Sequence, residues 1–361
     1  MKITIERSRA LAALNKVFGV VPSRTAIPIL GNVLISTHDD DSIVIRGTDL
    51  DMESVVVCEA DVHDGGTTTV DASKLRDIFN AAAQGSQISL ELTGDDPRMT
   101  VKSGRSRFKL PVLSAADYPF MPTHDGARFT IGAAELKAMI DYVAFAMSTE
   151  ETRYYLNGAL FTVRGGVLRL VATDGHKLAK IDGPEIEEFA PVIVPRKAVV
   201  EVQRALSSYS GEVSVVVGNS VSFCMGPHTI VTKQIDGSFP DYERVIPRDR
   251  SKEIVADSAL LTSAIKRAMI ATDDRSTSVV LSASDGVVAA FRRGDTEARD
   301  EFDAEYSDEP IEIGFNAKYL LDTLARLSGD VSVCLTDPAS PSVWRARGDD
   351  NGLAVVMPLR V

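Results

Sequence analysis

The residues best suited to chemistry lie together in the segment 173–177, which reads Thr-Asp-Gly-His-Lys. An aspartate beside a histidine can orient an imidazole for general acid–base catalysis, so a hydrolase that uses Asp174 and His176 is one hypothesis. The flanking residues favour another interpretation, because Asp-Gly between two apolar runs predicts a two-residue hairpin turn. The same signal recurs at Asp285 and Gly286, and no GxSxG, Walker-type loop or catalytic Cys/His arrangement accompanies either segment. We therefore expect turns here rather than an active site.

Cysteine and histidine are sparse and scattered. Cys58, Cys224 and Cys334 lie far apart in segments typical of apolar strands, so neither a CxxC metal site nor a disulfide framework is indicated. We expect all three to be small buried hydrophobic residues. The five histidines form no HExxH pattern and no cluster with cysteine, so the sequence predicts neither a metal site nor a cofactor.

Two further segments carry residues that could bind a partner. Arg153, Tyr154 and Tyr155 stand at the head of a predicted strand, where a sheet edge with a half-buried tyrosine is the ordinary interpretation. The alternative is stacking on, or bonding to, nucleic acid or a peptide. The chain ends in the apolar run 354–361, which is typical of a final core strand. Met357 and its neighbours would nevertheless leave apolar surface near a free terminus, where methionine suits an adaptable peptide groove.

The elements that must position these residues follow a threefold internal repeat. A β-like start followed by an amphipathic helix recurs with spacings of 126 and 124 residues, and a second helix recurs with spacings of 124 and 121. The first helix of each unit is predicted at 8–19, 133–146 and 258–271, and the second at 73–83, 195–207 and 316–327. Two independent markers with nearly the same period indicate three similar units, in line with the two or three domains that 361 residues suggest.

Each unit is predicted to consist of helix, strands, helix, strands. Ser73 and Asn316 are plausible N-caps, and Pro195 suits a first helical turn. Strands rich in Val, Ile and Leu are predicted at 42–47, 167–172 and 279–283, among others. We expect an α+β fold in which each domain carries two helices on one face of antiparallel sheets. Loop-like stretches between the units place the three tandem domains at 1–122, 128–248 and 252–361.

Charge is segregated between the predicted helices and the rest of the chain. The net charge of −12 argues against nucleic-acid binding, because binding to phosphates relies on Lys and Arg. The six helices, however, carry twelve basic and five acidic residues, a net +7, which leaves −19 elsewhere. Basic residues on any one helix usually decorate a solvated face, but the same bias on all six predicts a basic surface that contacts phosphates without reading sequence. The candidate residues are Lys74, Lys137, Arg196, Lys197, Lys266 and Arg267.

The composition is that of an ordinary folded protein, with 44% hydrophobic and 25% charged residues. The first residues alternate polar and apolar, unlike a signal peptide, and no later run approaches the length of a membrane span. We therefore expect a cytoplasmic protein with no membrane contact.

With these segments in place, the chain resembles the bacterial DNA polymerase III beta subunit, the sliding clamp, over its whole length. Eight short segments carry the resemblance in order: IPILGN at 27–32, GTDL at 47–50, SGRSRF at 103–108, RYYLNG at 153–158, TDGH at 173–176, VPRK at 194–197, FPDY at 239–242 and VMPLR at 356–360. The resemblance implies a non-enzymatic accessory subunit of a DNA polymerase holoenzyme, whose three clamp domains form a half ring. Two such chains, joined head to tail, would form a homodimeric ring that encircles duplex DNA as a processivity factor.

The resemblance also implies three sets of site residues. At the dimer interface, Arg105, Arg107, Phe108 and Leu110 of one chain would meet Ile270, Ala271, Glu297 and Glu301 of the next. Arg24, Tyr154 and Tyr155 match positions near DNA. A groove between the second and third domains would be lined by Arg153, Leu156, Thr173, Gly175, His176, Lys177, Leu178, Pro240, Arg244, Val245, Asn316, Tyr319, Val343, Val355, Val356, Met357, Pro358, Leu359 and Arg360.

This groove would hold a short, partly apolar peptide from the DNA polymerase III alpha subunit, the clamp loader, another polymerase or a repair protein. Three residues depart from the family pattern: Lys177 where arginine is expected, Ser276 where an aromatic wall can occur, and Glu150 in the loop before Arg153. An altered peptide preference would follow from the first two. The departures keep open a second hypothesis, a clamp-like paralogue that acts as a peptide-binding scaffold outside core replication.

Overall fold

The computed structural model describes residues 1–92, 94, 98–122, 125–248, 251–271, 277–292 and 297–360, with the backbone only of residues 271, 289, 291 and 292. Internal contacts divide the chain into two compact units. Unit 1 comprises Met1–Ala134 with Val200–Gln234, and unit 2 comprises Glu135–Val199 with Ile235–Val361. The middle repeat therefore contributes to both units. In the described ranges no helix is long and apolar enough to cross a membrane.

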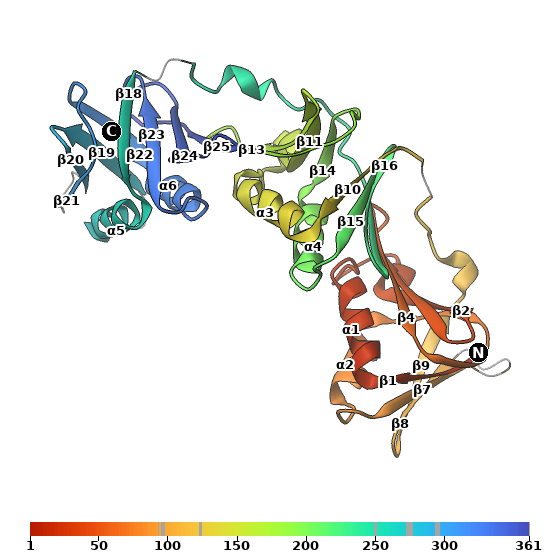
Figure 1. The fold of residues 1–361 in the computed structure, drawn as a ribbon. Coiled ribbons are helices and arrows are strands. Elements are labelled where there is room, and N and C mark those ends of the chain that lie inside the picture. The colour runs from red at the N-terminus through yellow and green to blue at the C-terminus, as the bar shows by residue number, and fades with distance from the viewer. Residues whose placement is uncertain are drawn as a thin grey trace. The chain divides into compact units, whose positions relative to one another are not determined.

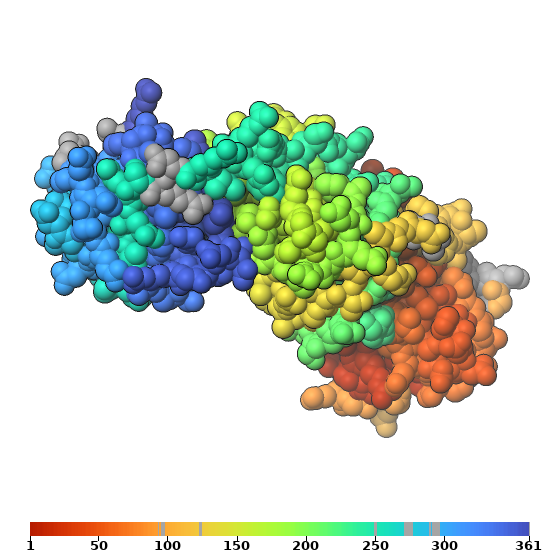
Figure 2. Space-filling view, turned by 45° about the horizontal axis from the view of Figure 1, so that its top comes forward, coloured from red at the N-terminus to blue at the C-terminus, as the bar shows by residue number. Residues whose placement is uncertain are grey.

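Unit 1 is built on one antiparallel sheet of thirteen strands, in the order β10-β15-β16-β17-β4-β3-β2-β6-β9-β8-β7-β1-β5. The first repeat supplies β1 (Lys2–Glu6), β2 (Asn32–Asp39), β3 (Ser42–Thr48), β4 (Met52–Glu59), β5 (Asp61–Asp64), β6 (Thr67–Asp71), β7 (Gln87–Glu91), β8 (Arg98–Ser103) and β9 (Ser106–Leu113). The middle repeat supplies β10 (Ala127–Gly132), β15 (Glu212–Val217), β16 (Ser220–Met225) and β17 (His228–Lys233). Because β17 pairs with β4, the green segment of the middle repeat lies against the orange strands of the first (Figure 1, Figure 2).

The core of unit 1 lies between this sheet and the helices α1 (Arg7–Phe18) and α2 (Ala72–Ala81), which contact each other on one face of it (Figure 1). Apolar residues at helical spacing form the buried stripes, and Leu14, Leu75 and Phe79 are fully enclosed. The short 3₁₀ helices η1 (Pro28–Gly31) and η2 (Ala115–Asp117) lie in the loops.

Unit 2 contains an eight-stranded antiparallel sheet, β14-β11-β12-β13-β25-β24-β23-β18, and a four-stranded one, β21-β20-β19-β22. The middle repeat supplies β11 (Gly158–Arg164), β12 (Val167–Thr173), β13 (Lys177–Glu185) and β14 (Val192–Pro195). The last repeat supplies β18 (Lys252–Asp257), β19 (Ser278–Ser284), β20 (Val287–Arg292), β21 (Ala298–Asp303), β22 (Ile311–Asn316), β23 (Asp330–Leu335), β24 (Ser342–Ala346) and β25 (Gly352–Val356). Pairing of β13 with β25 continues the sheet from one repeat into the next.

The helices of the last repeat, α5 (Ser258–Ala268) and α6 (Ala317–Leu324), contact each other and cover the core of that repeat. In this core Phe315 and Trp344 meet edge to face with ring centroids 6.0 Å apart. The middle repeat carries α3 (Ala133–Val143) and α4 (Arg196–Leu206). The remaining 3₁₀ helices are η3 (Ala144–Ala146), η4 (Glu151–Leu156), η5 (Tyr242–Arg244) and η6 (Met269–Ala271).

The predicted order of helix, strands, helix, strands is confirmed in each repeat, and so is the α+β fold class. The last residues of the helices predicted at 133–146 and 258–271 form the 3₁₀ helices η3 and η6 instead of a continued α-helix. The three cysteines lie on strands as expected, with Cys58 and Cys334 buried and Cys224 half-buried, and all three are free thiols.

The predicted helix starts are correct in one case of three. Asn316 caps α6, as expected, by accepting a hydrogen bond from the amide of Lys318. The prediction of Ser73 as the cap of α2 is wrong. The cap is Asp71, two residues before Ser73, whose side chain accepts a hydrogen bond from the Lys74 amide. Pro195 is the last residue of β14 and precedes α4, so it does not occupy the first helical turn.

Candidate functional site

The turn that contains Asp174 and His176 joins β12 to β13. The Asp174 Oδ1 atom accepts hydrogen bonds from the amides of His176 and Lys177, both at 2.9 Å, and Gly175 adopts a φ of 88°. Three residues separate the strands, so the two-residue turn predicted here is wrong, because the aspartate side chain stabilises a longer turn. The turn at Asp285 has two residues, as predicted, with φ values of 48° and 79°.

The acid–base hypothesis fails on the same geometry. While Oδ1 of Asp174 holds the turn, its Oδ2 binds the Lys177 ammonium at 2.6 Å. The His176 ring stacks on Tyr319 with a centroid distance of 6.0 Å. The carboxylate is therefore occupied by structural contacts and makes none with the imidazole that could orient it for catalysis.

Beside this turn lies a pocket of about 230 Å³ within unit 2. Its lining consists of Leu156, Thr173, Gly175, His176, Lys177, Leu178, Pro240, Asp241, Tyr242, Val245, Val355 and Met357. Ten of these twelve are predicted groove residues, so the structure brings together side chains that are far apart in the sequence. The sequence analysis missed Asp241 and Tyr242, although both belong to the FPDY segment on which the resemblance relies.

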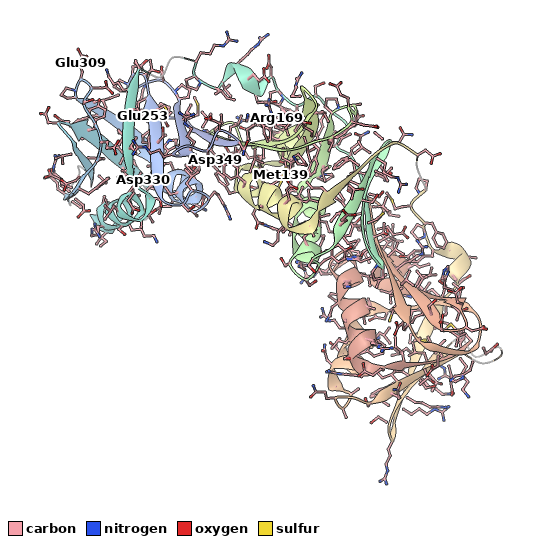
Figure 3. The ribbon with its side chains drawn as sticks, viewed as in Figure 1. Met139, Arg169, Glu253, Glu309, Asp330 and Asp349 are labelled. Atoms are coloured by element: carbon pink, nitrogen blue, oxygen red, sulfur yellow. The ribbon has the colours of Figure 1, made fainter. Side chains whose placement is uncertain are left out.

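Tyr242 forms part of the pocket wall and is held from behind by Arg169, a residue of β12 that Figure 3 labels. The Arg169 guanidinium donates to the Tyr242 hydroxyl at 3.3 Å and binds Asp182 at 2.5 and 3.0 Å. Hydrogen bonding to Asp182 raises the pKa of Arg169 above its usual range. Tyr242 is only 4% exposed, so this anchor fixes one wall of the pocket.

The cations around the pocket have acidic partners within the chain. Lys177 is 8% exposed, and besides Asp174 its ammonium contacts the Tyr319 ring, 4.5 Å from the centroid. Arg244 binds Asp241 at 2.8 Å. Arg153, at the rim, lies 3.7 Å from a carboxylate oxygen of Glu150 and donates to the backbone oxygen of Asp174. The pocket therefore presents an apolar interior with a rim that is neutralised internally.

The tail reaches the pocket after its last strand ends. Val343, Val355 and Val356 are buried strand residues, whereas Met357 is 36% and Leu359 is 41% exposed. The amide of Met357 donates to the backbone oxygen of His176 at 2.9 Å, which places this side chain at the pocket. The chain is a core strand only as far as Val356, so its apolar end leaves surface available, as the sequence suggested.

Not every predicted groove residue lines the pocket. Asn316 serves as the cap of α6, and the Leu359 amide donates to the backbone oxygen of Gly314 at 2.7 Å. Pro358 is half-buried and Arg360 exposed. Ser276 lies outside the described residues.

The segment around Arg153 differs from the prediction. Arg153, Tyr154 and Tyr155 belong to the 3₁₀ helix η4, and β11 begins only at Gly158, so the expected strand head is wrong. Tyr154 is 55% exposed, and Tyr155 packs against the apolar cluster beneath the pocket. The two rings meet edge to face at 5.7 Å.

The predicted phosphate-binding residues lie at helix surfaces and in one loop. Arg24, Lys74, Arg196, Lys197, Lys266 and Arg267 are exposed, and Lys137 is half-buried. Lys137 binds Asp141 and Arg267 binds Asp300, each at 2.6 Å. Arg196 and Lys197 lie together at the start of α4, and Lys266 and Arg267 at the end of α5.

The predicted interface residues lie in or next to β9, in or next to β21, and in η6. Arg105 occupies the turn before β9, which contains Arg107, Phe108 and the buried Leu110. Ile270 and Ala271 belong to η6, Glu301 is in β21, and Glu297 directly precedes that strand. Phe108 is 38% and Ile270 is 81% exposed.

Comparison with known proteins matches the three repeats individually. Models of the DNA polymerase III beta subunit match its N-terminal domain to residues 1–122, its central domain to 130–241 and its C-terminal domain to 243–360. A beta sliding clamp of Caulobacter vibrioides is 42% identical over 374 residues, which cover all of both chains. The crystal structure of a sliding clamp from Bartonella birtlesii bound to griselimycin superposes with a TM-score of 0.96 at 37% identity, again over all of both chains. A clamp from Caulobacter crescentus gives a TM-score of 0.95 at 42% identity and the same coverage.

Threefold α+β architecture and full-length similarity together define a DNA sliding clamp, a non-catalytic processivity factor of a DNA polymerase. Within that class, the chain belongs to the DNA polymerase III beta subunit family. The hypothesis of a paralogue outside replication is not favoured by relatives that carry the clamp name over their full length.

Proposed function

We propose that this clamp binds short, partly apolar peptides of its partners in the pocket beside the β12–β13 turn. The partners would be the DNA polymerase III alpha subunit, the clamp loader, other polymerases and repair proteins. The pocket carries this proposal: Leu178 and Val355 contribute apolar walls, and the exposed Met357 stands at its edge. An apolar groove with a flexible methionine suits an amphipathic peptide that buries a few side chains. The Bartonella birtlesii relative in complex with griselimycin shows that a clamp of this fold holds a ligand.

We further propose that two chains join head to tail, with β9 of one continuing the sheet at β21 of the other. Among the residues that the structure describes, the first part of β9 pairs with β8 on one side only, because β6 meets β9 just at Val112 and Leu113. In its own sheet, β21 is the last strand. Such edges can accept a further strand from another chain.

Side chains at these edges are complementary in charge and in polarity. Arg105 and Arg107 stand on the β9 side, while Glu297 and Glu301 stand on the β21 side. Phe108 and the strongly exposed Ile270 would supply the apolar contact. A contact between unlike surfaces closes into a ring when the rotation per chain is right, and a half ring of three domains, at 1–122, 128–248 and 252–361, would provide it.

Within the ring we propose sequence-independent contacts with duplex DNA. Arg24, the exposed Tyr154, Tyr155 and the basic residues of α2, α3, α4 and α5 would meet phosphates, which position a protein without specifying a base sequence. Every register then offers nearly the same energy, which permits sliding. We place this activity in the cytoplasm.

Retention on DNA tests the ring. The clamp is loaded onto a nicked circular plasmid, half of the sample is linearised, and clamp that remains bound is measured after gel filtration. We expect retention on the circle and loss from the linear form, because a ring slides off a free end. Equal retention on both forms would contradict encirclement.

Interface variants extend the test. Ile270→Asp should convert the dimer into monomers and abolish retention on circles, because it places a charge in the proposed apolar contact. The matched control is Val57→Asp, at an exposed position of β4 outside both edges. A dimeric Ile270→Asp variant would contradict the proposed interface without bearing on the pocket.

A further inference from the structure

The first repeat contains a second copy of the turn that borders the pocket. In both turns the threonine hydroxyl donates to the backbone oxygen four residues later, at 2.9 Å in Thr48–Met52 and 2.8 Å in Thr173–Lys177. The same hydroxyl accepts the amide two residues later at 3.1 Å in both. In both, the aspartate carboxylate accepts the next two amides of the turn. The third residue has a φ of 80° at Leu50 and 88° at Gly175.

The strands around the two turns are paired in the same register. Glu53 lies opposite Thr48 and Val231, just as Leu178 lies opposite Thr173 and Val355. A backbone amide of the neighbouring strand donates to the same position of each turn. The Lys233 amide donates to the backbone oxygen of Asp51, and the Met357 amide donates to that of His176, both at 2.9 Å. A buried tyrosine follows in each repeat, Tyr118 in the first and Tyr242 in the second. The first repeat therefore holds the framework of the pocket.

The floor residues differ between these two frameworks. At the pocket, Leu178 of β13 lines the cavity, and Val171 of β12 is fully buried with it in one apolar cluster. The residues at the same register positions in the first repeat are Arg46 of β3 and Glu53 of β4. Their side chains form an ion pair at 3.4 Å, in which Glu53 is almost fully buried.

This ion pair holds down the segment that follows Tyr118. The Arg46 guanidinium lies 5.7 Å from the centroid of the Phe120 ring, and the Met121 amide acts to lower the pKa of Glu53 against the larger effect of burial. At the pocket, the residue that corresponds to Phe120 is Arg244, which binds Asp241 and is largely exposed. Val245, which corresponds to Met121, is 46% exposed and lines the pocket. The Val245 amide donates instead to the backbone oxygen of Tyr242 at 3.2 Å, at the end of η5.

We propose that the Arg46–Glu53 ion pair closes the first-repeat copy of the peptide pocket and thereby restricts each chain to one peptide site. This inference rests on the proposed peptide binding at the other pocket. The two charges act together, because a buried carboxylate needs its partner and either residue alone would leave an unpaired charge. Burial raises the pKa of Glu53, and its Oε1 atom has no hydrogen-bond partner among the described residues. The ion pair is thus energetically unfavourable to bury, and it stands at positions where the pocket has apolar residues.

The test replaces Arg46 and Glu53 with the residue types found at the same register positions beside the pocket, in the double variant Arg46→Val/Glu53→Leu. The probe is a fluorescein-labelled synthetic peptide with the C-terminal sequence of the DNA polymerase III alpha subunit, titrated by calorimetry and anisotropy. We expect one peptide per chain for the wild type and two for the variant. The matched control is Arg9→Val/Glu59→Leu, which removes an exposed ion pair of the same unit and should leave one site.

The added site is then assigned to its place in the chain. When residues from Met357 onward are also deleted from the double variant, the first-repeat site should remain while the other weakens. A folded double variant that still binds one peptide per chain overturns the proposal. A wild type that binds no peptide contradicts the proposed function instead.

Hydrogen exchange gives a second measurement that needs no peptide. The Met121 amide should exchange at least tenfold faster in the Arg46→Val/Glu53→Leu variant than in the wild type, whereas the Val245 amide should be unchanged. Unchanged protection of Met121 in a folded variant would show that the ion pair does not hold this segment, and the proposal fails on that result alone.

Discussion

The turn at Thr48–Met52 and the turn at Thr173–Lys177 have the same hydrogen bonds, yet one covers an ion pair and the other borders an apolar pocket. A threonine and an aspartate suffice to specify the backbone, because their side chains satisfy the amides of the turn. What the site can bind depends on two positions in the strands that flank the turn. Backbone geometry and binding capacity are therefore separable in this fold.

The largest expected effect comes from placing a charge in the apolar floor. Leu178→Glu should weaken binding of the alpha-subunit peptide more than a hundredfold, because the carboxylate would lie buried without a partner. Anisotropy titration measures the loss, and Val287→Glu on the exposed surface of β20 is the matched control. Adding Val171→Arg should restore thermal stability but not binding, since it recreates the ion pair of the first repeat. Peptide binding by Val171→Arg/Leu178→Glu at wild-type strength would contradict this comparison.

Deletion of the tail from Met357 onward should have the next largest effect. It removes the exposed side chains of Met357 and Leu359, and burial of two such groups contributes on the order of 2 kcal/mol, roughly a thirtyfold change in affinity. The control is Val287→Ala, which removes exposed apolar surface of β20 and keeps the tail. An unchanged peptide affinity after the deletion would remove the tail from the site.

Low pH should destabilise unit 1 through His228. This residue lies on β17, at the register position that Gly352 occupies on β25 beside the pocket. His228 is 4% exposed, bonds to the Ser54 hydroxyl at 2.9 Å and has a pKa lowered to about 4 by burial and by Lys16. The neutral ring is favoured in the folded state, so its stabilisation is complete above the unfolded pKa of about 6.5 and declines as pH falls towards 4. The loss should reach about 3 kcal/mol.

Urea unfolding at pH 7, 5.5 and 4 measures this dependence. In a His228→Gln variant, the part of the pH dependence of the unfolding free energy that is due to this residue should vanish, although carboxyl groups elsewhere in the chain still contribute. The same slope in both proteins would show that His228 does not titrate on unfolding.

The smallest expected effect concerns the third residue of each turn. Leu50 has a φ of 80°, a conformation that costs an L-residue about 1 kcal/mol, whereas glycine accepts it at the corresponding position 175. Leu50→Gly should therefore stabilise the protein by at most about 0.5 kcal/mol in urea unfolding, because the greater freedom of glycine in the unfolded chain offsets part of the relieved strain. A destabilised variant would indicate that the partly exposed Leu50 side chain contributes packing that outweighs the strain.

Most of the local structure could be predicted from the sequence, because short-range rules govern it. The repeat, the strands that carry the cysteines and the cap at Asn316 all follow from periodicity and side-chain chemistry. The same rules misplaced the cap of α2 and the turn at Asp174, since an aspartate can satisfy amides from more than one position. They also misread Arg153, because aromatic residues before a strand resemble part of it.

Resemblance to a family located most of the pocket, but two contacts that shape it could be seen only in the structure. Tyr242 is held by Arg169, 73 residues away in the chain. The Lys177 ammonium lies 4.5 Å from the centroid of the Tyr319 ring, which belongs to the last repeat. No pattern along the chain reports such contacts, because they depend on which strands become neighbours.

By itself, the sequence determined that three similar α+β units follow one another, that their helices are more basic than the remainder, and to which family the chain belongs. Periodicity and composition are properties of the chain, so they needed no coordinates. Only the tertiary structure decided that β13 pairs with β25 and β4 with β17. The first pairing brings Val355 of the last repeat beside Leu178 at the pocket, and the second brings Val231 of the middle repeat beside Glu53, which forms the ion pair with Arg46.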